Sequence, residues 1–72
     1  MSDTIIRVSL RQSPTELYKI LKFEGLVASG AEAKQVIAEA FVTVNGQVET
    51  QKRKKIHSGD TISFDGHTIA IN

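Results

Sequence analysis

The hydrophobic pattern of the chain changes from alternating to helical and back to alternating. Residues 4–10 (TIIRVSL) are rich in β-branched side chains and predict a first strand. The same signals predict four later strands, at residues 41–44, 48–49, 61–64 and 67–71. The dipeptides Asn45-Gly46 and Asp65-Gly66 favour type I′ hairpin turns, because both residues of each pair tolerate positive φ. We therefore expect a mainly antiparallel sheet.

The first helical segment opens with strong start signals. Ser13 suits the N-cap, Pro14 suits the first helical position, and Glu16, three residues after the serine, completes a capping box. An apolar stripe with helical spacing follows. Gly25 suits the C′ position at the end of the helix.

A second start signal precedes the next helical segment. Ser29 with Glu32 repeats the capping box, and an apolar stripe follows at Ala33, Val36, Ile37 and Ala40. The expected order of elements is therefore β-α-α-β-β-β-β. Helices grouped beside a mainly antiparallel sheet make the fold class α+β. We expect residues 1–72 to form a single domain, since so short a chain cannot build two cores.

Composition narrows the class of protein. Apolar residues make up 40% of the sequence and charged residues 24%, which is typical of a globular domain rather than a disordered chain. The chain has no cysteine, so a disulfide framework or a thiolate metal site is excluded. The first residues lack the pattern of a secretory signal, and no apolar run approaches the length of a membrane span. We expect a cytoplasmic protein that does not enter a membrane.

Four positive charges stand side by side in the stretch QKRKKI, residues 51–56, although the formal net charge of the chain is only +1. In an unbroken strand, Lys52 and Lys54 would share the face of Ile56, and burying two unpaired ammonium groups is costly. No run of carboxylates stands nearby to pair with them. We therefore expect a loop or bulge between about residues 50 and 55.

This basic run has two interpretations. Lysines on an edge strand keep a sheet from pairing with a neighbour, and the run could be such a solvated edge. Closely spaced Lys and Arg also neutralise backbone phosphates and release counterions, which is typical of a nucleic-acid contact. Charge alone does not decide between them.

The start of the second helix is a candidate anion site. Ser29, Gly30 and Ala31 are small, so backbone N–H groups and the positive end of the helix dipole can approach a phosphate. Lys34 lies four residues after Gly30, on the same side of the helix. The alternative is that Ser29 and Glu32 only cap the helix.

Several segments together resemble the S4 RNA-binding domain family. They are residues 17–21, 25–26, 29–34, 42–46 and 59–62, and the resemblance spans residues 15–64. Further segments make the chain similar to the small stand-alone bacterial members, at residues 37–39, 48–50, 52–53, 55–56, 63–64 and 66–67. The resemblance implies an αL motif, which is a unit of two short helices plus a hairpin that grips structured RNA.

The resemblance, with the two basic features above, gives a set of candidate RNA contacts. They are Lys19, Lys22, Ser29, Gly30, Lys34, Lys52, Arg53, Lys54 and Lys55. The chain departs from the family at residues 16–18, where Glu-Leu-Tyr replaces Arg-Leu-Asp, and at residues 29–30, where Ser-Gly replaces Ser-Arg. Because these arginines are missing, Lys34 and the basic run become the main candidates for RNA contact. Within that run, we expect residues 53–55 to contribute more to RNA binding than Lys52.

The expected partner is structured RNA of ribosomal or transfer-RNA type. Double-stranded RNA displays phosphates and 2′-hydroxyls across a wide minor groove, which suits recognition of shape by a basic surface. Ribosomal or RNA-processing proteins are further candidate partners, and we expect a monomer. The alternative function is a protein–protein adaptor that docks its basic loop on an acidic partner.

The aromatic residues offer few candidates for stacking on bases. Phe23, Phe41 and Phe64 each neighbour an apolar stripe or strand, so we assign them to the core. Tyr18 lies beside the apolar face of the first helix, where we expect a half-buried ring with a solvated hydroxyl.

No constellation of residues points to catalysis. His57 and His67 stand beside predicted turns with Asp60 and Asp65 near, and a metal or acid–base site could be imagined from them. Surface histidines are the simpler interpretation, because the chain has no His pair at helical spacing and no Gly-rich phosphate loop. We therefore expect no enzymatic activity, no cofactor and no bound metal.

Overall fold

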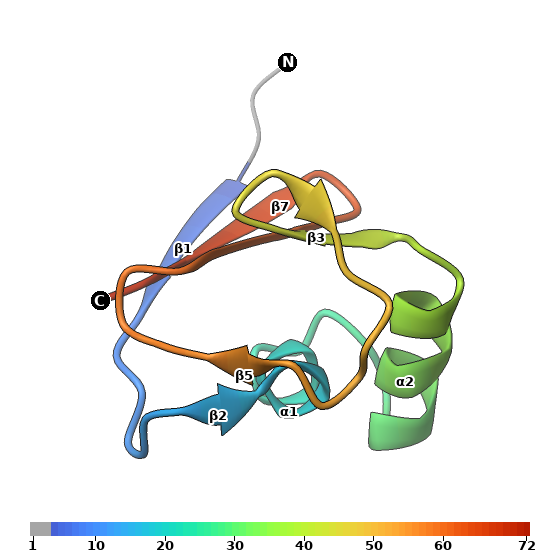
Figure 1. The fold of residues 1–72 in the computed structure, drawn as a ribbon, viewed down its shortest axis with the longest axis horizontal. Coiled ribbons are helices and arrows are strands. Elements are labelled where there is room, and N and C mark those ends of the chain that lie inside the picture. Colours follow the sequence, from blue (N-terminus) through green and yellow to red (C-terminus); the bar gives the residue numbers. More distant parts are fainter. Residues whose placement is uncertain (1–3) are drawn as a thin grey trace.

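Five strands form a mixed sheet, and two short helices pack against one side of it (Figure 1). The computed structural model describes residues 4–72. The strands of this sheet are β1 (Thr4–Val8), β3 (Val42–Val44), β4 (Gln47–Val48), β6 (Thr61–Phe64) and β7 (His67–Ile71), in the spatial order β1-β7-β6-β3-β4. β1 runs parallel to β7, whereas the other neighbours are antiparallel. The α+β class with a mainly antiparallel sheet is confirmed.

A second, two-stranded unit lies beside the helices. β2 (Thr15–Glu16) pairs antiparallel with β5 (Lys55–Ile56), so that Glu16 stands opposite Lys55. The order of elements is therefore β-β-α-α-β-β-β-β-β, and the expected order omitted these two strands. Strands of two residues show no alternation to detect, and they form only because segments distant in sequence meet.

The first helix begins later than its sequence signals predict. The helix α1 spans Leu17–Phe23, and its N-cap is Glu16, whose side chain makes no capping hydrogen bond. The predicted capping box with Ser13 is wrong, because β2 holds the residues after Pro14 in an extended conformation against β5. Local capping preference here yields to long-range strand pairing.

The second helix and the basic run behave more nearly as expected. The helix α2 spans Gly30–Ala38, with Ser29 as its N-cap. Residues 49–54 belong to no strand, and the side chains of Lys52 and Lys54 are exposed, so the expected break is present. We expected the loop or bulge to extend to about residue 55, but Lys55 already belongs to strand β5.

Buried apolar side chains from both layers make one core. They are Leu17, Ile20, Leu21, Val27, Ala33, Ile37, Val42, Val44, Ile56, Ile62, Ile69 and Ile71. Phe64 packs at the edge of this core, as expected. Assigning Phe23 and Phe41 to the core is wrong, since 71% and 61% of their surfaces are exposed. Phe23 lies on the flank of α1 away from its buried side chains, and Phe41 precedes β3 in line with the outward-facing Thr43.

Both helices end in left-handed residues. Gly25 takes the C′ position after α1 with φ of 73°, as predicted. After α2 the same position is held by Ala40, with φ of 68°. The N–H of Ala40 donates to the carbonyl of Ile37, and the N–H of Phe41 donates to that of Val36. This is a Schellman motif in which Ala40 leaves the predicted apolar stripe and carries backbone strain.

A side-chain clamp joins the β3–β4 hairpin to the start of β6. Asn45 and Gly46 both have positive φ, as a type I′ turn requires. The N–H of Thr61 donates to Asn45 Oδ1 at 2.9 Å, and Asn45 Nδ2 donates to Asp60 Oδ1 at 3.1 Å. Asp60 Oδ2 also accepts from the N–H of His57 at 2.8 Å. The bond from the His57 amide and that from Asn45 hold the pKa of Asp60 below its ordinary value of 3.8.

Ala40→Gly should stabilise the protein. Glycine removes the left-handed strain of about 1–2 kcal/mol but adds roughly 0.5–1 kcal/mol of chain entropy to the unfolded state. The expected net result is an increase in the free energy of unfolding of up to about 1 kcal/mol, measured by urea titration. Ala38→Gly, inside the last turn of α2, serves as the control and should lower stability. A loss of stability in both variants would show that Ala40 is not strained.

Asp60→Asn should lower stability at neutral pH. Because the folded-state pKa of Asp60 lies below the unfolded value, the stabilisation is present above about pH 4 and is lost as pH falls through the folded value. The difference in free energy of unfolding between the two proteins should therefore shrink as the pH falls below about 4. Asp65→Asn, at the other hairpin turn, removes the same charge and serves as the control. A constant difference at all pH values would contradict the role of the charged carboxylate.

Candidate nucleic-acid interface

Backbone carbonyls of the basic segment, residues 52–55, receive the first amides of α1. The N–H of Leu17 donates to the carbonyl of Lys54 at 2.9 Å, and the N–H of Tyr18 donates to that of Lys52 at 3.1 Å. The amides at the start of a helix have no partner within it, so these bonds replace the missing cap. The basic segment is consequently fixed against the amino end of α1.

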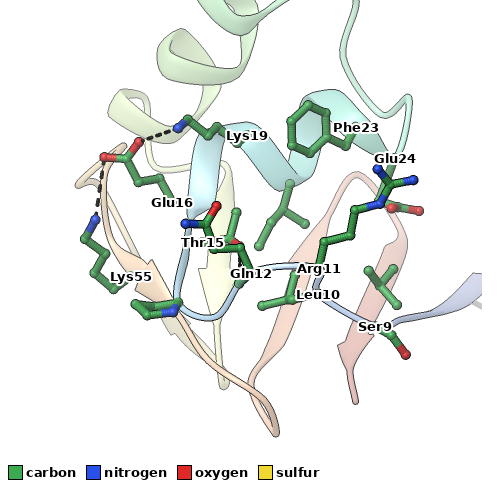
Figure 2. Close-up of a pocket in the computed structure, with 13 residues that line it drawn as sticks. Ser9, Leu10, Arg11, Gln12, Thr15, Glu16, Lys19, Phe23, Glu24 and Lys55 are labelled. Carbon is green, nitrogen blue, oxygen red and sulfur yellow. Dashed lines mark hydrogen bonds and ion pairs between the residues drawn. The ribbon is translucent and has the colours of Figure 1, made fainter.

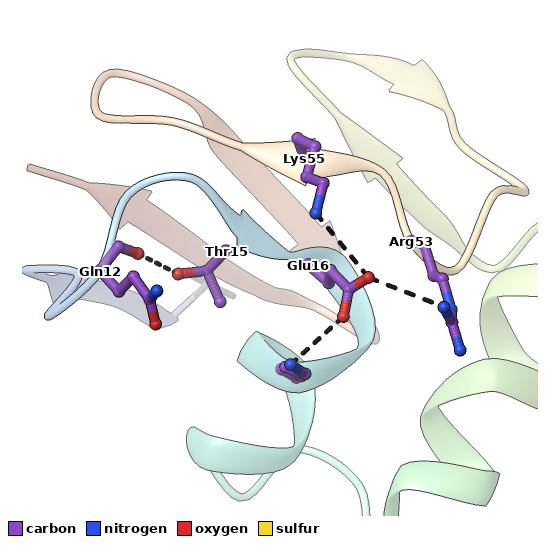
Figure 3. Close-up of polar contacts among 6 residues, drawn as sticks. Gln12, Thr15, Glu16, Arg53 and Lys55 are labelled. Atoms are coloured by element: carbon purple, nitrogen blue, oxygen red, sulfur yellow. Dashed lines mark hydrogen bonds and ion pairs between the residues drawn. The ribbon is translucent and has the colours of Figure 1, made fainter.

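One carboxylate gathers three of the cations (Figure 3). Glu16 Oε1 lies 3.3 Å from Lys19 Nζ, and its Oε2 lies 3.9 Å from Lys55 Nζ and 4.0 Å from Arg53 Nε. The sequence offered no run of carboxylates near the basic run, and Glu16 supplies a partner from a segment far earlier in the chain. The pairing of Glu16 with Lys55 in the β2–β5 unit brings them together. That pairing has no local sequence signal, which is why sequence reasoning missed the role of Glu16.

The carboxylate lies beneath the cations. Only 17% of the Glu16 side chain is exposed, against 46% for Lys19, 59% for Lys55 and 67% for Arg53. Partial desolvation raises the pKa of Glu16, but the hydrogen bond and charge of Lys19 with the charges of Lys55 and Arg53 outweigh it, so this pKa lies below its ordinary value. Ion pairs this exposed add little stability, so their main effect is to position the cations.

Tyr18 joins this cluster to the second helix. Lys34 Nζ lies 4.8 Å from the centroid of the Tyr18 ring, and Lys19 Nζ lies 6.0 Å from it, both within reach of a cation–π contact. Gly30 lies against the same ring, since a Cβ placed there would stand 3.9 Å from Cε2. The ring is partly buried, as expected. We name Lys19, Lys34, Arg53 and Lys55, gathered by Glu16 and Tyr18, the cation cluster.

The start of α2 is occupied by its own capping groups. Ser29 Oγ accepts from the N–H of Glu32 at 3.1 Å, and Glu32 Oε1 accepts from the N–H of Ala28 at 2.6 Å. The carboxylate of Glu32 therefore already lies at the positive end of the helix. This geometry favours a capping role for Ser29, whereas Lys34 reaches the cation cluster through the Tyr18 ring.

Among the residues that the structure describes, the three further candidate lysines form no ion pair with Glu16 and no cation–π contact with Tyr18. Lys22 is exposed in the last turn of α1, one turn beyond Tyr18. Lys52 is exposed, and its carbonyl is one of the two groups that fix the segment to α1. Lys54 is also exposed, and its charge contributes to the lowered pKa of Asp60.

The histidines lie at the surface and at a strand end. His57 is exposed, with Nδ1 4.0 Å from Asp60 Oδ2, and His67 begins β7. Across residues 4–72, the structure shows no group of three or more His, Asp or Glu side chains that could hold a metal ion. In the same range, no helix has the length and apolar character needed to cross a bilayer.

Comparisons with known proteins agree on one family. A family model described as the S4 domain matches residues 8–72. YbcJ of Escherichia coli (strain K12) is 52% identical over 64 residues, which cover 88% of this chain and 91% of that protein. YbcJ of Shigella flexneri matches with the same identity and coverage.

Solved structures give the same result. The solution structure of E. coli YbcJ, described as revealing an αL motif involved in RNA binding, superposes with a TM-score of 0.66 at 42% identity and covers 99% of this chain and 89% of that one. The 30S ribosomal protein S4e of Thermoplasma acidophilum superposes with a TM-score of 0.58 at 24% identity, over 82% of this chain and 31% of that one, and shows a shared fold. The resemblance found in the sequence is confirmed, and this chain belongs to the S4 domain family.

Proposed function

We propose that this protein binds structured RNA through the cation cluster and catalyses no reaction. Membership of the S4 domain family supports the proposal, as does similarity to YbcJ, whose αL motif is described as involved in RNA binding. The elements of that motif, α1, α2 and the β3–β4 hairpin, are all present here. Ribosomal and transfer-RNA-like structures, and the proteins that assemble or process them, are the partners this function implies.

One observation carries the proposal. Cations from three separate segments, Lys19 on α1, Lys34 on α2 and Arg53 with Lys55 on the basic segment, converge around Glu16 and Tyr18. The side chains of Lys19, Arg53 and Lys55 are more exposed than that of Glu16, which lies beneath them. A backbone of phosphates can therefore meet several cations at once, and each contact releases condensed counterions.

The arrangement suits recognition of shape better than of sequence. Lys and Arg side chains held at fixed places contact phosphates, which position a protein without reading bases. Paired RNA presents phosphates and 2′-hydroxyls on a wide, shallow groove and keeps the base edges of its other groove out of reach. A rigid cluster on the amino end of a short helix complements such a surface.

Replacing Arg53 and Lys55 together with alanine should weaken binding to a hairpin RNA by roughly tenfold or more at low salt, because two phosphate contacts are lost and Glu16 is left with one ion-pair partner. The slope of log affinity against log salt concentration should flatten by about 1.5–2 units. Fluorescence anisotropy across a salt series measures both quantities. Thermal unfolding should change little, because the ion pairs are exposed.

The matched control is Arg7→Ala. Arg7 is exposed on β1, on the face of the sheet opposite the core side taken by its neighbours Ile6 and Val8. Its loss removes a positive charge without touching the cluster, so it should flatten the slope far less. If Arg7→Ala flattened the slope by half as much as the double variant, or more, the interaction would depend on net charge alone. Unchanged RNA affinity in the double variant would overturn the proposal. A pull-down in which an acidic protein partner stays bound after ribonuclease treatment would also overturn it.

A further inference from the structure

A groove of about 750 Å³ runs along α1 beside the cation cluster (Figure 2). One side is formed by the connection between β1 and β2, and the other by α1. Leu10, Ile20 and Phe23 supply apolar surface, and Arg11, Lys19 and Lys55 supply positive charge. Cavities that enclose small molecules in proteins span about 300–1,000 Å³, so the groove can hold a group of that size.

Phe23 is the unusual member of this lining. Its ring is 71% exposed although it belongs to a helix whose other large apolar residues are buried. Burying a phenylalanine is normally favourable by about 1.5–3 kcal/mol, so a ring left open beside a cavity is a surface for a flat apolar partner. The ring stands at the groove next to Glu24, toward which the Arg11 side chain points (Figure 2).

The groove and the cation cluster share two of their cations. Lys19 and Lys55 belong to both, and Glu16 beneath them lines the groove as well. Lys19 lies four residues before Phe23, so the two side chains occupy neighbouring places on one flank of α1, with Cβ atoms about 5–6 Å apart. A nucleotide has its phosphate and its base separated by a similar span. Lys19 and Phe23 line the same groove, so a phosphate held by the Lys19 end and a base lying on Phe23 can belong to one short stretch of RNA.

We propose that this groove takes the base of an unpaired nucleotide, bulged or at a helix end, of the RNA whose phosphates the cation cluster holds. The inference rests on the proposed function and adds a second kind of contact to it. The base stacks on the Phe23 ring, and every base offers a π-face for such stacking. Arg11 and Gln12 donate to base acceptors, and the carboxylates of Glu16 and Glu24 accept from amino groups.

The charge of the rim favours a nucleotide over an apolar peptide. Three cations, Arg11, Lys19 and Lys55, line the groove against two carboxylates, and Glu16 is already paired with two of these cations. An apolar peptide would bring no charge to match the excess. A base attached to a phosphodiester brings an apolar plane and a negative charge together, which is the combination that the groove and the cluster present.

The test compares two hairpin RNAs that differ only in one bulged nucleotide in the stem. Phe23→Ala should weaken binding of the bulged hairpin about 5- to 150-fold, the loss that corresponds to one base–aromatic stack, and leave the fully paired hairpin unchanged. Phe23→Leu keeps an apolar side chain without a ring and should lose affinity similarly, whereas Phe23→Tyr should retain it. With 2-aminopurine at the bulge, fluorescence should be quenched by the unaltered protein and by Phe23→Tyr only.

Phe41→Ala is the matched control. Phe41 is exposed to a similar degree, 61%, but lines a separate hollow with Thr43 and Ser63 on the sheet, so it should not distinguish the two hairpins. Because both rings are exposed, thermal unfolding should be nearly unchanged in all variants. Equal losses on both hairpins, or no loss on the bulged one, would overturn the groove assignment alone. Failure of the unaltered protein to bind either hairpin would overturn the proposed function and the groove together.

Discussion

The structure depends on the meeting of the basic segment with the amino end of α1. The amide of Leu17 donates to the carbonyl of Lys54, and the amide of Tyr18 donates to that of Lys52, so the bonds join segments far apart in the sequence. Each buried or half-buried helix end needs partners for its amides, and here the chain itself provides them. These bonds fix the start of α1. The adjoining β2–β5 pair places Glu16 opposite Lys55. A seven-residue helix is marginal alone, and this junction with the core below is what holds it.

The same junction explains how a nearly neutral chain brings several cations together. The formal net charge is +1, so this gathering does not arise from a general excess of cations. It arises because α1, α2 and the basic segment each contribute cations to one place, where a single carboxylate lies beneath them. Glu16 lowers the mutual repulsion of the lysines and arginine, and its own low pKa follows from the hydrogen bond and charges that overcome its desolvation.

Much of the fold could be predicted from local signals, and the exceptions share one cause. The Asn45-Gly46 turn, the Ser29 cap and the Gly25 end each rest on residues within a few positions of one another, and each is present. The start of α1, the β2–β5 pair and the partner of the basic run depend on segments roughly forty residues apart. Ser13, Pro14 and Glu16 gave a helix signal that strand pairing overruled.

The candidate site also divides into features that local sequence signals predict and features that depend on contacts between distant segments. The basic residues were evident from composition and from the family resemblance, and the structure shows which of them meet. Glu16, a departure from the family pattern, takes the role of organiser, while Ser29 serves the helix cap. Phe23 was assigned to the core because it neighbours an apolar stripe, but the stripe on α1 is narrow and its buried members are Leu17, Ile20 and Leu21. Phe23 lies two residues after the buried Leu21, about 200° around the helix, and this offset places it at the surface rather than in the core.

The two flanks of α1 consequently face two different neighbours. On one flank Tyr18 meets Gly30 and Lys34 of α2, and on the other Phe23 and Lys19 border the groove. A helix turns by about 100° per residue, so a helix this short can bury one stripe and still present an aromatic ring on each side of it. Because β2, the basic segment and the core all fix α1, the backbone positions that carry the ring and the cations keep their spacing. A backbone fixed in this way suits recognition of a shape, since fewer groups lose conformational freedom on binding.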